Sequence, residues 1–586
     1  MTGFIVSSLR LPVLKEYKGY EIQKVGRYEI LFKPDSKFKA DKVCAWDKGV
    51  FFLLNGVILN SKELMEDNQA ENMTQLCKAL YEKLGGTFHN CFIGNYAGLV
   101  YDEQADKLAV FTNKLSSLQL FYYDGKEGFV ASSLITDIAE TLKHHKIGYS
   151  FNRDAAYLMM TYGYMGTDDT FIREVKKINA GHQIEKKGDS ISEDVCYHRF
   201  TNHKYDLSKA TEEEIIEGID ERFRKAIKRE YEKDLETDIP YYFRSLTAGT
   251  DSRACAFVAR DLGFSDVVNY TIGIPGNYDE RIAREISDFY GENLAFISNL
   301  PFKNQGSFLK KIDETTYKTQ GNAYYLEVAQ SAISALELNE ESFALSHGGS
   351  FSEAFLTTGY LKDPKNEEPR EPLHVYSRML IDKCPKEHLK LYENEDIYSI
   401  YSIFLNKHVP TGRNLLKPGI NTAYPGLDDD LVSYCLSIPL ELRKRYYIYH
   451  KWLFTKCPEA ANFKLEKLNA RPKDSRIRKH LAKYTRYGSL LQYVRCSKDP
   501  LPKKLRERFE LDKKIKPGKQ ALMPFDWWFD QNPEIRQYIS DYLEDNITNP
   551  VLDDELRADI RYMFDNGLAR PKSMALTVLA AAKLYF

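Results

Sequence analysis

The chain has 586 residues, of which 43% are hydrophobic and 28% charged. This composition is ordinary for a folded globular protein, and the length exceeds what one hydrophobic core supports, so we expect two or more domains. The 82 Lys and Arg residues nearly balance the 84 Asp and Glu residues, and the net charge is -2. That balance argues against nucleic acid or an anionic membrane as the partner.

The cysteines indicate the compartment. All nine are scattered, with no Cys-x-x-Cys pair and no paired histidines at metal-ligand spacing. Such a set favours a reducing environment over a disulfide framework or a zinc site. The amino terminus lacks a basic flank followed by a long apolar core, and no apolar stretch approaches the length of a membrane span. We therefore expect a cytoplasmic protein with no membrane partner.

Short strands dominate the first 200 residues. Apolar runs at Val50–Leu54, Ala97–Tyr101 and Leu108–Phe111 are separated by polar turns, and a helix is predicted at Glu71–Leu84.

The pattern changes at about residue 205, where strands begin to alternate with amphipathic helices. The predicted elements are Glu212–Glu232 (helix), Tyr241–Leu246 (strand), Ser252–Leu262 (helix), Val267–Ile274 (strand), Glu280–Tyr290 (helix) and Leu294–Ile297 (strand). This alternation predicts right-handed crossovers and a parallel sheet whose ligands bind at the carboxyl ends of the strands. Beyond about residue 330 we expect mainly helices, with an exposed loop at 362–372. The locally basic segment at 464–519 is interpreted as a solvated helical surface, with a docking patch for an acidic partner as the alternative.

The turn between the first strand of the alternating region and its helix has the layout of a phosphate-binding loop. Ala248 and Gly249 let backbone N–H groups approach an anion closely, and the helix start adds a partial positive charge. Thr247, Thr250 and Ser252 add hydroxyl donors. An Asp beside phosphate implies a divalent cation between them, so Asp251 is predicted to bind magnesium. The loop therefore indicates a nucleoside triphosphate.

The sequence Thr247–Ser252 resembles the Ser-Gly-Gly-x-Asp-Ser loop of the ATP pyrophosphatase superfamily and, within it, the asparagine synthetase-like family. Further segments match that family's pattern in the same order: Tyr270–Gly273 with Asp279–Ala283, Leu345–Phe355, Tyr424–Asp428 and His450–Phe454. The family's acidic residue within the glycine pair of the second loop is lost here, and Ser352 stands at its Asp position.

This resemblance implies ATP and Mg²⁺ as cofactors and assigns roles to individual residues. Glu353 would share magnesium with Asp251, and Lys451 would neutralise the phosphates during adenylation, as an ammonium group suits charge that develops on phosphorus. The predicted nucleotide-binding residues are Leu246, Thr247, Gly249, Thr250, Ser252, Ile272 and Gly273, the last two beside the adenine.

The amino-terminal half resembles the glutamine-hydrolysing domain of class II amidotransferases. Asn55–Asn60 resembles that family's Asn-Gly-x-x-x-Asn segment, which contributes to the oxyanion hole, and Asn113–Tyr122 resembles its Arg-Asp-x-x-Gly strand and turn. The family's nucleophile is a Cys at the second position, where this chain has Thr2. We therefore expect a degenerate glutaminase site, similar to that of β-lactam synthetases.

The fold expected from these resemblances is α/β, with two domains. Residues 1–200 would form an Ntn-like αββα sandwich, and residues 205–586 a doubly wound parallel-sheet ATP pyrophosphatase domain with a helical C-terminal part. The expected activity is an AMP-forming carbon–nitrogen ligase that activates a small-molecule carboxylate as an acyl-adenylate for attack by ammonia or an amine, without its own glutamine hydrolysis. A homodimer is left open.

Three other interpretations remain at this point. The chain could be a catalytically inactive homologue that serves as a binding or regulatory module, because Thr2, Ala248 and Ser352 all depart from the family patterns. It could be a hydrolase with Thr2 as the N-terminal nucleophile, a known arrangement in which the α-amino group acts as the base. A tRNA-modifying or sulfur-transfer enzyme is disfavoured by the neutral charge and the absence of a Cys pair.

Overall fold

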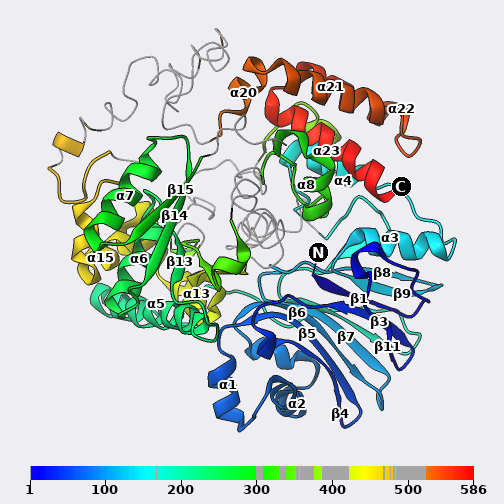
Figure 1. Ribbon diagram of the computed structural model, residues 1–586, viewed down its shortest axis with the longest axis horizontal. Helices are drawn as coiled ribbons and strands as arrows, with labels where there is room; N and C mark the ends of the chain where they lie inside the picture. Colours follow the sequence, from blue (N-terminus) through cyan, green and yellow to red (C-terminus); the bar gives the residue numbers. More distant parts are fainter. Residues whose placement is uncertain are drawn as a thin grey trace.

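A computed structural model describes residues 2–166, 168–298, 308–328, 338–350, 355–356, 375–385, 421–465, 469–475, 477–479 and 523–586, together with residues 482, 504 and 508. Figure 1 shows two bodies side by side, each built around β-sheet, and a group of helices beside the N-terminal one. In the described part of the chain, no helix combines the length and apolarity needed to cross a membrane.

Two six-stranded antiparallel sheets build the N-terminal half (Figure 1). One has the order β10-β8-β9-β1-β3-β2, formed by β1 (Gly3–Ser7), β2 (Gln23–Val25), β3 (Tyr28–Lys33), β8 (Phe121–Gly125), β9 (Gly128–Ser132) and β10 (Val175–Lys177). The other has the order β12-β11-β7-β6-β5-β4, formed by β4 (Val43–Asp47), β5 (Val50–Ile58), β6 (Gly94–Asp102), β7 (Lys107–Thr112), β11 (His182–Lys187) and β12 (Glu193–Cys196).

Alternating side chains divide each sheet into an inner and an outer face. Phe4 and Val6 of β1 share one buried cluster with Phe51 and Leu53 of β5, which places this cluster between the sheets. The outer faces pack on helices, α2 (Met73–Leu84) with α1 (Ser61–Asn68) on one side and α3 (Ile135–His144) with α4 (Arg153–Tyr162) on the other. The N-terminal half is thus the αββα sandwich expected from the sequence.

A five-stranded parallel sheet with the order β15-β14-β13-β16-β17 forms the second body. Its strands are β13 (Tyr242–Ser245), β14 (Val267–Gly273), β15 (Asn293–Ser298), β16 (Leu345–His347) and β17 (Asn421–Ala423). The helices are α5 (Glu212–Asp234), α6 (Thr250–Asp261), α7 (Tyr278–Tyr290), α13 (Asp429–Ser437), α14 (Leu440–Arg443) and α15 (Tyr447–Lys456). The chain adds strands first to one side of β13 and then to the other, so the topological switch point lies between β13 and β16.

The predicted alternation of helices and strands is confirmed, with shifted boundaries. Helix α6 begins at Thr250 instead of Ser252, and α7 begins at Tyr278 because the Asn277 side chain accepts the N–H of Glu280 at 2.8 Å. Helix α2 begins at Met73 for the same reason, since Asn72 caps it. Helix α1 was not predicted from the sequence.

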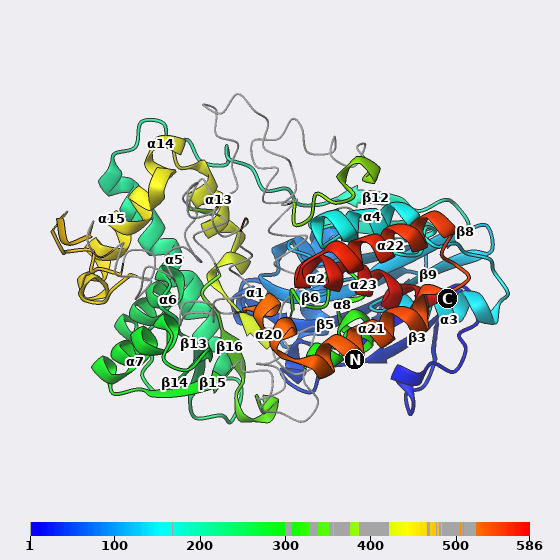
Figure 2. The ribbon, with the colours of Figure 1, turned by 90° about the horizontal axis from the view of Figure 1, so that it is seen from above.

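The predicted helical C-terminal part exists, but its last helices pack on the N-terminal half. They are α20 (Phe525–Gln531), α21 (Pro533–Ile547), α22 (Asp554–Asn566) and α23 (Ala569–Tyr585), joined by α8 (Ile312–Thr319). Figure 2 shows them beside α3 and α4, and α23 contacts both. Helix α23 is apolar around most of its circumference, so it has to be buried on several sides.

Candidate functional site

The predicted phosphate loop joins the end of β13 to α6 at the switch point. Leu246 is fully buried and Ala248 nearly so, and these two residues anchor the loop to the core. Gly249 is the N-cap of α6 and provides no side-chain acceptor for the first backbone N–H groups of the helix. The uncapped helix start therefore retains the partial positive charge that favours an anion.

Hydroxyl groups hold the loop in shape. Ser252 Oγ accepts the Thr247 N–H at 3.1 Å and lies 3.0 Å from Thr247 Oγ1, which accepts the Gly249 N–H at 3.1 Å. At position 247 these contacts require only a hydroxyl, which either Ser or Thr would supply. Thr247, Gly249, Thr250 and Ser252 all lie in this turn and the first turn of α6.

A carboxylate from α7 also contacts the loop. Asp279 Oδ1 accepts the Ala248 N–H at 2.8 Å, so one backbone donor of the loop already binds an anionic group of the protein itself. The sequence placed Asp279 in a family segment without giving it this contact.

The second predicted loop lies directly against the first. A Cβ atom at Gly349 would come within 2.4 Å of the Ser252 backbone nitrogen and 2.6 Å of its Cα, so only glycine allows this approach. Gly348 is held on the other side by its N–H, which donates to the Ala423 carbonyl at 2.7 Å. The two loops are thus in direct contact. Ser352 and Glu353, the latter predicted to bind magnesium, lie outside the described residues.

Helix α15 presents two different faces to its surroundings. Tyr449 donates its hydroxyl to Asp251 Oδ1 at 3.0 Å, whereas the Lys451 Nζ donates to Glu212 Oε2 at 2.5 Å, at the start of α5. Residues two positions apart on a helix point about 200° apart. The structure therefore brings Tyr449, which was not predicted, to Asp251 and does not bring Lys451 there.

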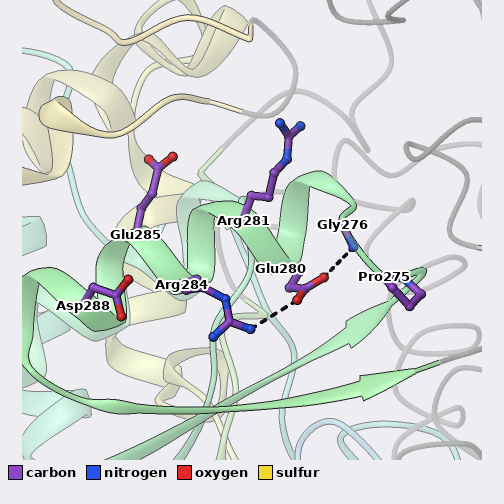
Figure 3. A pocket seen from close by; sticks show the side chains of 7 residues that line it. All are labelled: Pro275, Gly276, Glu280, Arg281, Arg284, Glu285 and Asp288. Atoms are coloured by element: carbon purple, nitrogen blue, oxygen red, sulfur yellow. Dashed lines mark hydrogen bonds and ion pairs between the residues drawn. The ribbon is translucent and has the colours of Figure 1, made fainter.

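The end of β14, predicted to meet the adenine, is closely covered. Ile272 is buried, and a Cβ atom at Gly273 would lie 2.1 Å from the Asn277 side chain. Figure 3 shows a surface pocket that continues from this strand end along α7, where Glu280 accepts the Gly276 N–H and pairs with Arg284 at 3.2 Å. None of the predicted nucleotide-binding residues lines this pocket.

The segment Tyr424–Asp428 lies at the boundary between the two bodies. The side chain of Asp428 caps α13 and pairs with Arg229 of α5 at 2.5 Å, and the same guanidinium binds both oxygens of Glu63 in α1 at 2.6 Å. The next residue, Asp429, pairs with Lys114 at 2.7 Å. Two consecutive aspartates thus tie the parallel-sheet body to the sandwich.

The residues that resemble a glutaminase site make structural contacts. Asn55 Oδ1 accepts the Asp35 N–H at 3.4 Å, and the Gly56 carbonyl accepts from Lys42 at 2.8 Å. Asn113, in place of the family's Arg, donates to the Gly94 carbonyl at 2.8 Å. Together with the ion pair of Lys114, these contacts give the segment a role in packing.

The described residues are compatible with Mg²⁺ bound largely through phosphate. No group of three His, Cys, Asp or Glu side chains among them is arranged to hold a metal on its own. Magnesium commonly uses only one or two carboxylates with substrate phosphates, and Asp251 at the start of α6 supplies one. The Tyr449 hydroxyl would orient that carboxylate.

Comparison with known proteins supports the N-terminal assignment. Residues 42–198, which lie within the sandwich region, match the glutamine amidotransferase domain family. No curated protein sequence matches the chain.

Two solved structures illustrate the similarity. The glutamine phosphoribosylpyrophosphate amidotransferase from B. subtilis, complexed with ADP and GMP, has 10% identity and a TM-score of 0.24, over 52% of this chain and 88% of that one. An allosteric regulatory enzyme of purine biosynthesis has 9% identity and a TM-score of 0.23, over 50% and 74% of the two chains. Both TM-scores are too low to indicate a shared architecture for the whole chain.

Proposed function

We propose that the chain is an ATP-dependent amide-forming ligase with an amidotransferase-type domain that serves as a scaffold. The proposal rests mainly on one observation: the Thr247–Ser252 loop and the Gly348–Gly349 loop are packed together at the switch point of a parallel sheet, where nucleotides bind in such folds. The uncapped start of α6 adds donors and positive potential for a polyphosphate.

In the proposed reaction, a substrate carboxylate attacks the α-phosphate of ATP and pyrophosphate leaves. Ammonia or an amine then attacks the acyl-adenylate, forms the amide and releases AMP. The loop would bind the departing phosphates, and Asp251, oriented by Tyr449, would hold Mg²⁺, which supplies charge neutralisation when bound. The nitrogen would come from free ammonia or a second substrate, because Thr2 replaces the glutaminase nucleophile.

The direct test is ATP–pyrophosphate exchange, measured across a panel of carboxylic acids. We expect exchange that depends on one class of carboxylate. We also expect more amide product with ammonium than with glutamine as the nitrogen donor. Absence of exchange with every acid, despite a folded protein, would favour the inactive binding module. Hydrolytic activity that needs no ATP and is lost in Thr2→Ala would favour the N-terminal hydrolase.

Lys451 remains the proposed cation for the transition state, although its ion pair with Glu212 holds it elsewhere in this structure. Comparison of Lys451→Ala with Glu212→Ala tests this role. If Lys451 moves to the phosphates, its removal lowers kcat while Glu212→Ala leaves kcat intact, because the second change frees the lysine. If both variants changed kcat by the same small amount, the Lys451–Glu212 pair would be a surface ion pair with no role in catalysis.

A further inference from the structure

Arg253 is a fully buried cation in the first turn of α6, two residues after Asp251. Its guanidinium donates to four backbone carbonyls: Lys464 at 2.7 Å, Ala460 at 3.2 Å, Phe463 at 3.4 Å and Ala248 at 3.5 Å. One of these carbonyls belongs to the phosphate loop, and the other three belong to the segment that follows α15. Arg253 therefore joins the loop to that segment.

No hydrogen bond of Arg253 within the described residues goes to a carboxylate, and its Nε is buried without a partner. Burial lowers the pKa of Arg253 to about 10, which leaves the guanidinium charged at neutral pH. Glu285, exposed on α7, acts on this charge only at longer range.

A second buried arginine below the same loop provides a contrast. Arg244 of β13 is equally inaccessible, but it pairs with Glu292 at 2.6 Å and binds Asn269 at 2.9 Å. Its charge is therefore neutralised within the protein. Arg253, only nine positions later, retains a positive charge that carbonyl dipoles solvate and that no ion pair cancels among the residues the structure describes. Isolated buried charges are costly, and an anionic ligand nearby would offset that cost.

The carbonyl contacts also form one side of a two-point attachment. Tyr449 of α15 binds Asp251, and Arg253 binds Ala460 within the short helix Pro458–Asn462 and the two residues that follow this helix. The stretch from α15 to residue 464 is thus fastened to both ends of the first turn of α6. A change at either point would alter the position of this stretch relative to the loop that carries Asp251.

We propose that Arg253 is a positioning residue of the phosphate site, whose uncancelled buried charge favours polyphosphate at the Thr247–Ser252 loop and whose carbonyl contacts fix the segment after α15 against it. This inference rests on the proposed function, because it presumes that the loop binds the phosphates of ATP. It predicts that Arg253 contributes to affinity in proportion to the phosphate charge of the ligand.

The test is the ratio of the adenosine dissociation constant to the ATP dissociation constant, measured calorimetrically with Mg²⁺ present. In Arg253→Gln we expect this ratio to fall about tenfold or more, because adenosine carries no phosphate to attract. In Arg253→Lys, which keeps the charge, the ratio should stay within about threefold of the wild type. Arg244→Gln is the matched control, and it should lower stability while leaving the ratio unchanged.

The outcomes separate the two proposals. If the wild type binds ATP no better than adenosine, or binds neither, the proposed function fails. If the wild type prefers ATP and Arg253→Gln retains that preference, the role of Arg253 is refuted. Should the Gln variant not fold, Arg253→Lys still decides, because a folded Lys variant that has lost the preference for ATP would contradict the role of the charge.

Discussion

At the scale of single residues, the structure gives Asp251 a precise environment. Its position in the first turn of α6 places a carboxylate where anions are favoured, and one of its oxygens accepts the Tyr449 hydroxyl at 3.0 Å. The Tyr449 phenol is completely buried. Its burial and, to a lesser extent, the negative charge of Asp251 raise the pKa of Tyr449 well above its ordinary value. Tyr449 therefore remains a hydrogen-bond donor at any physiological pH and limits the orientations of the carboxylate.

Asp251→Asn should abolish ATP-dependent turnover, with a loss of at least about a hundredfold in kcat/KM, because an amide is a poor magnesium ligand. The fold should be retained, since Asp251 is only partly buried at the edge of the sheet. Pyrophosphate release measures turnover, and the midpoint of thermal unfolding shows whether the fold is retained. Turnover at the wild-type rate would remove Asp251 from the site.

Tyr449→Phe should raise the Mg²⁺ concentration needed for half-maximal activity by about tenfold, because the metal ligand would lose the group that orients it. At saturating Mg²⁺, kcat should return towards the wild-type value. A magnesium titration of the initial rate measures this effect. Tyr447→Phe is a suitable control, since it removes a hydroxyl of α15 that donates to Glu212 at 2.9 Å. An unchanged magnesium requirement would make the Tyr449 hydroxyl a packing feature.

At the scale of elements, the loops and helices of the parallel sheet could be predicted well because their signals are local. The run Tyr241–Leu246 followed by small residues identifies a strand and a turn without any distant contact. By contrast, the face of α15 that meets the loop depends on packing against α5 and α6. A match to a short motif therefore drew attention to Lys451, whereas Tyr449 has no signal in the sequence other than its place two residues earlier.

A buried ionic cluster between α5 and β16 could not be predicted either, because its histidine is more than a hundred residues away from its two carboxylates. His347 Nε2 lies 2.9 Å from Asp234 and its Nδ1 lies 3.5 Å from Glu230, all nearly inaccessible to water. Burial raises the pKa of Glu230 to about 7. Burial alone would lower the pKa of His347, but the neighbouring carboxyl groups of Asp234 and Glu230 raise it to about 9.

The pH dependence of stability follows from these shifts. Glu230 is held in its neutral form by the fold, so the free energy of unfolding should decrease as pH rises from about 4.5 to 7. The stabilisation from charged His347 is complete below about pH 6.5 and is lost as pH rises through 9. Glu230→Gln should remove the first decrease and stabilise the protein at pH 8 by on the order of 2 kcal/mol. Urea unfolding of the wild type and of Glu230→Gln at pH 5, 7 and 9 measures the free energy of unfolding at each pH. If that free energy fell between pH 5 and 7 as much in the variant as in the wild type, this account would be contradicted.

At the scale of the whole molecule, the order of the sequence is a poor guide to which parts pack together. The helices α20–α23 follow the parallel sheet in the chain but cover α3 and α4 of the sandwich, and Tyr157 of α4 donates to Asp559 of α22 at 2.7 Å. Amphipathic patterns identify an apolar face without specifying what covers it. The predicted division at about residue 200 therefore describes the two sheets and not the helices.

The two sheets are also joined by buried charge. Lys233 at the end of α5 pairs with Asp41 of the sandwich at 2.9 Å and donates to Ser61 at 3.0 Å, and both charged side chains are about 1% exposed. Asp41 in turn accepts the Ile58 N–H at 2.8 Å. Loss of Lys233 would leave the Asp41 charge buried and unpaired, whereas loss of Asp41 would leave Lys233 its second ion pair, with Glu236 at 2.7 Å. Removal of Lys233 alone is therefore more costly than removal of both members of the pair.

Lys233→Met should therefore lower the free energy of unfolding by about 3 kcal/mol or more, whereas Lys233→Met combined with Asp41→Asn should recover most of that loss. The Asn oxygen still accepts the Ile58 N–H, so the double change removes charge without removing that hydrogen bond. Denaturant unfolding of the wild type, both single variants and the double variant completes the cycle. Additive losses would mean that the Lys233–Asp41 pair does not couple the sandwich to the parallel sheet.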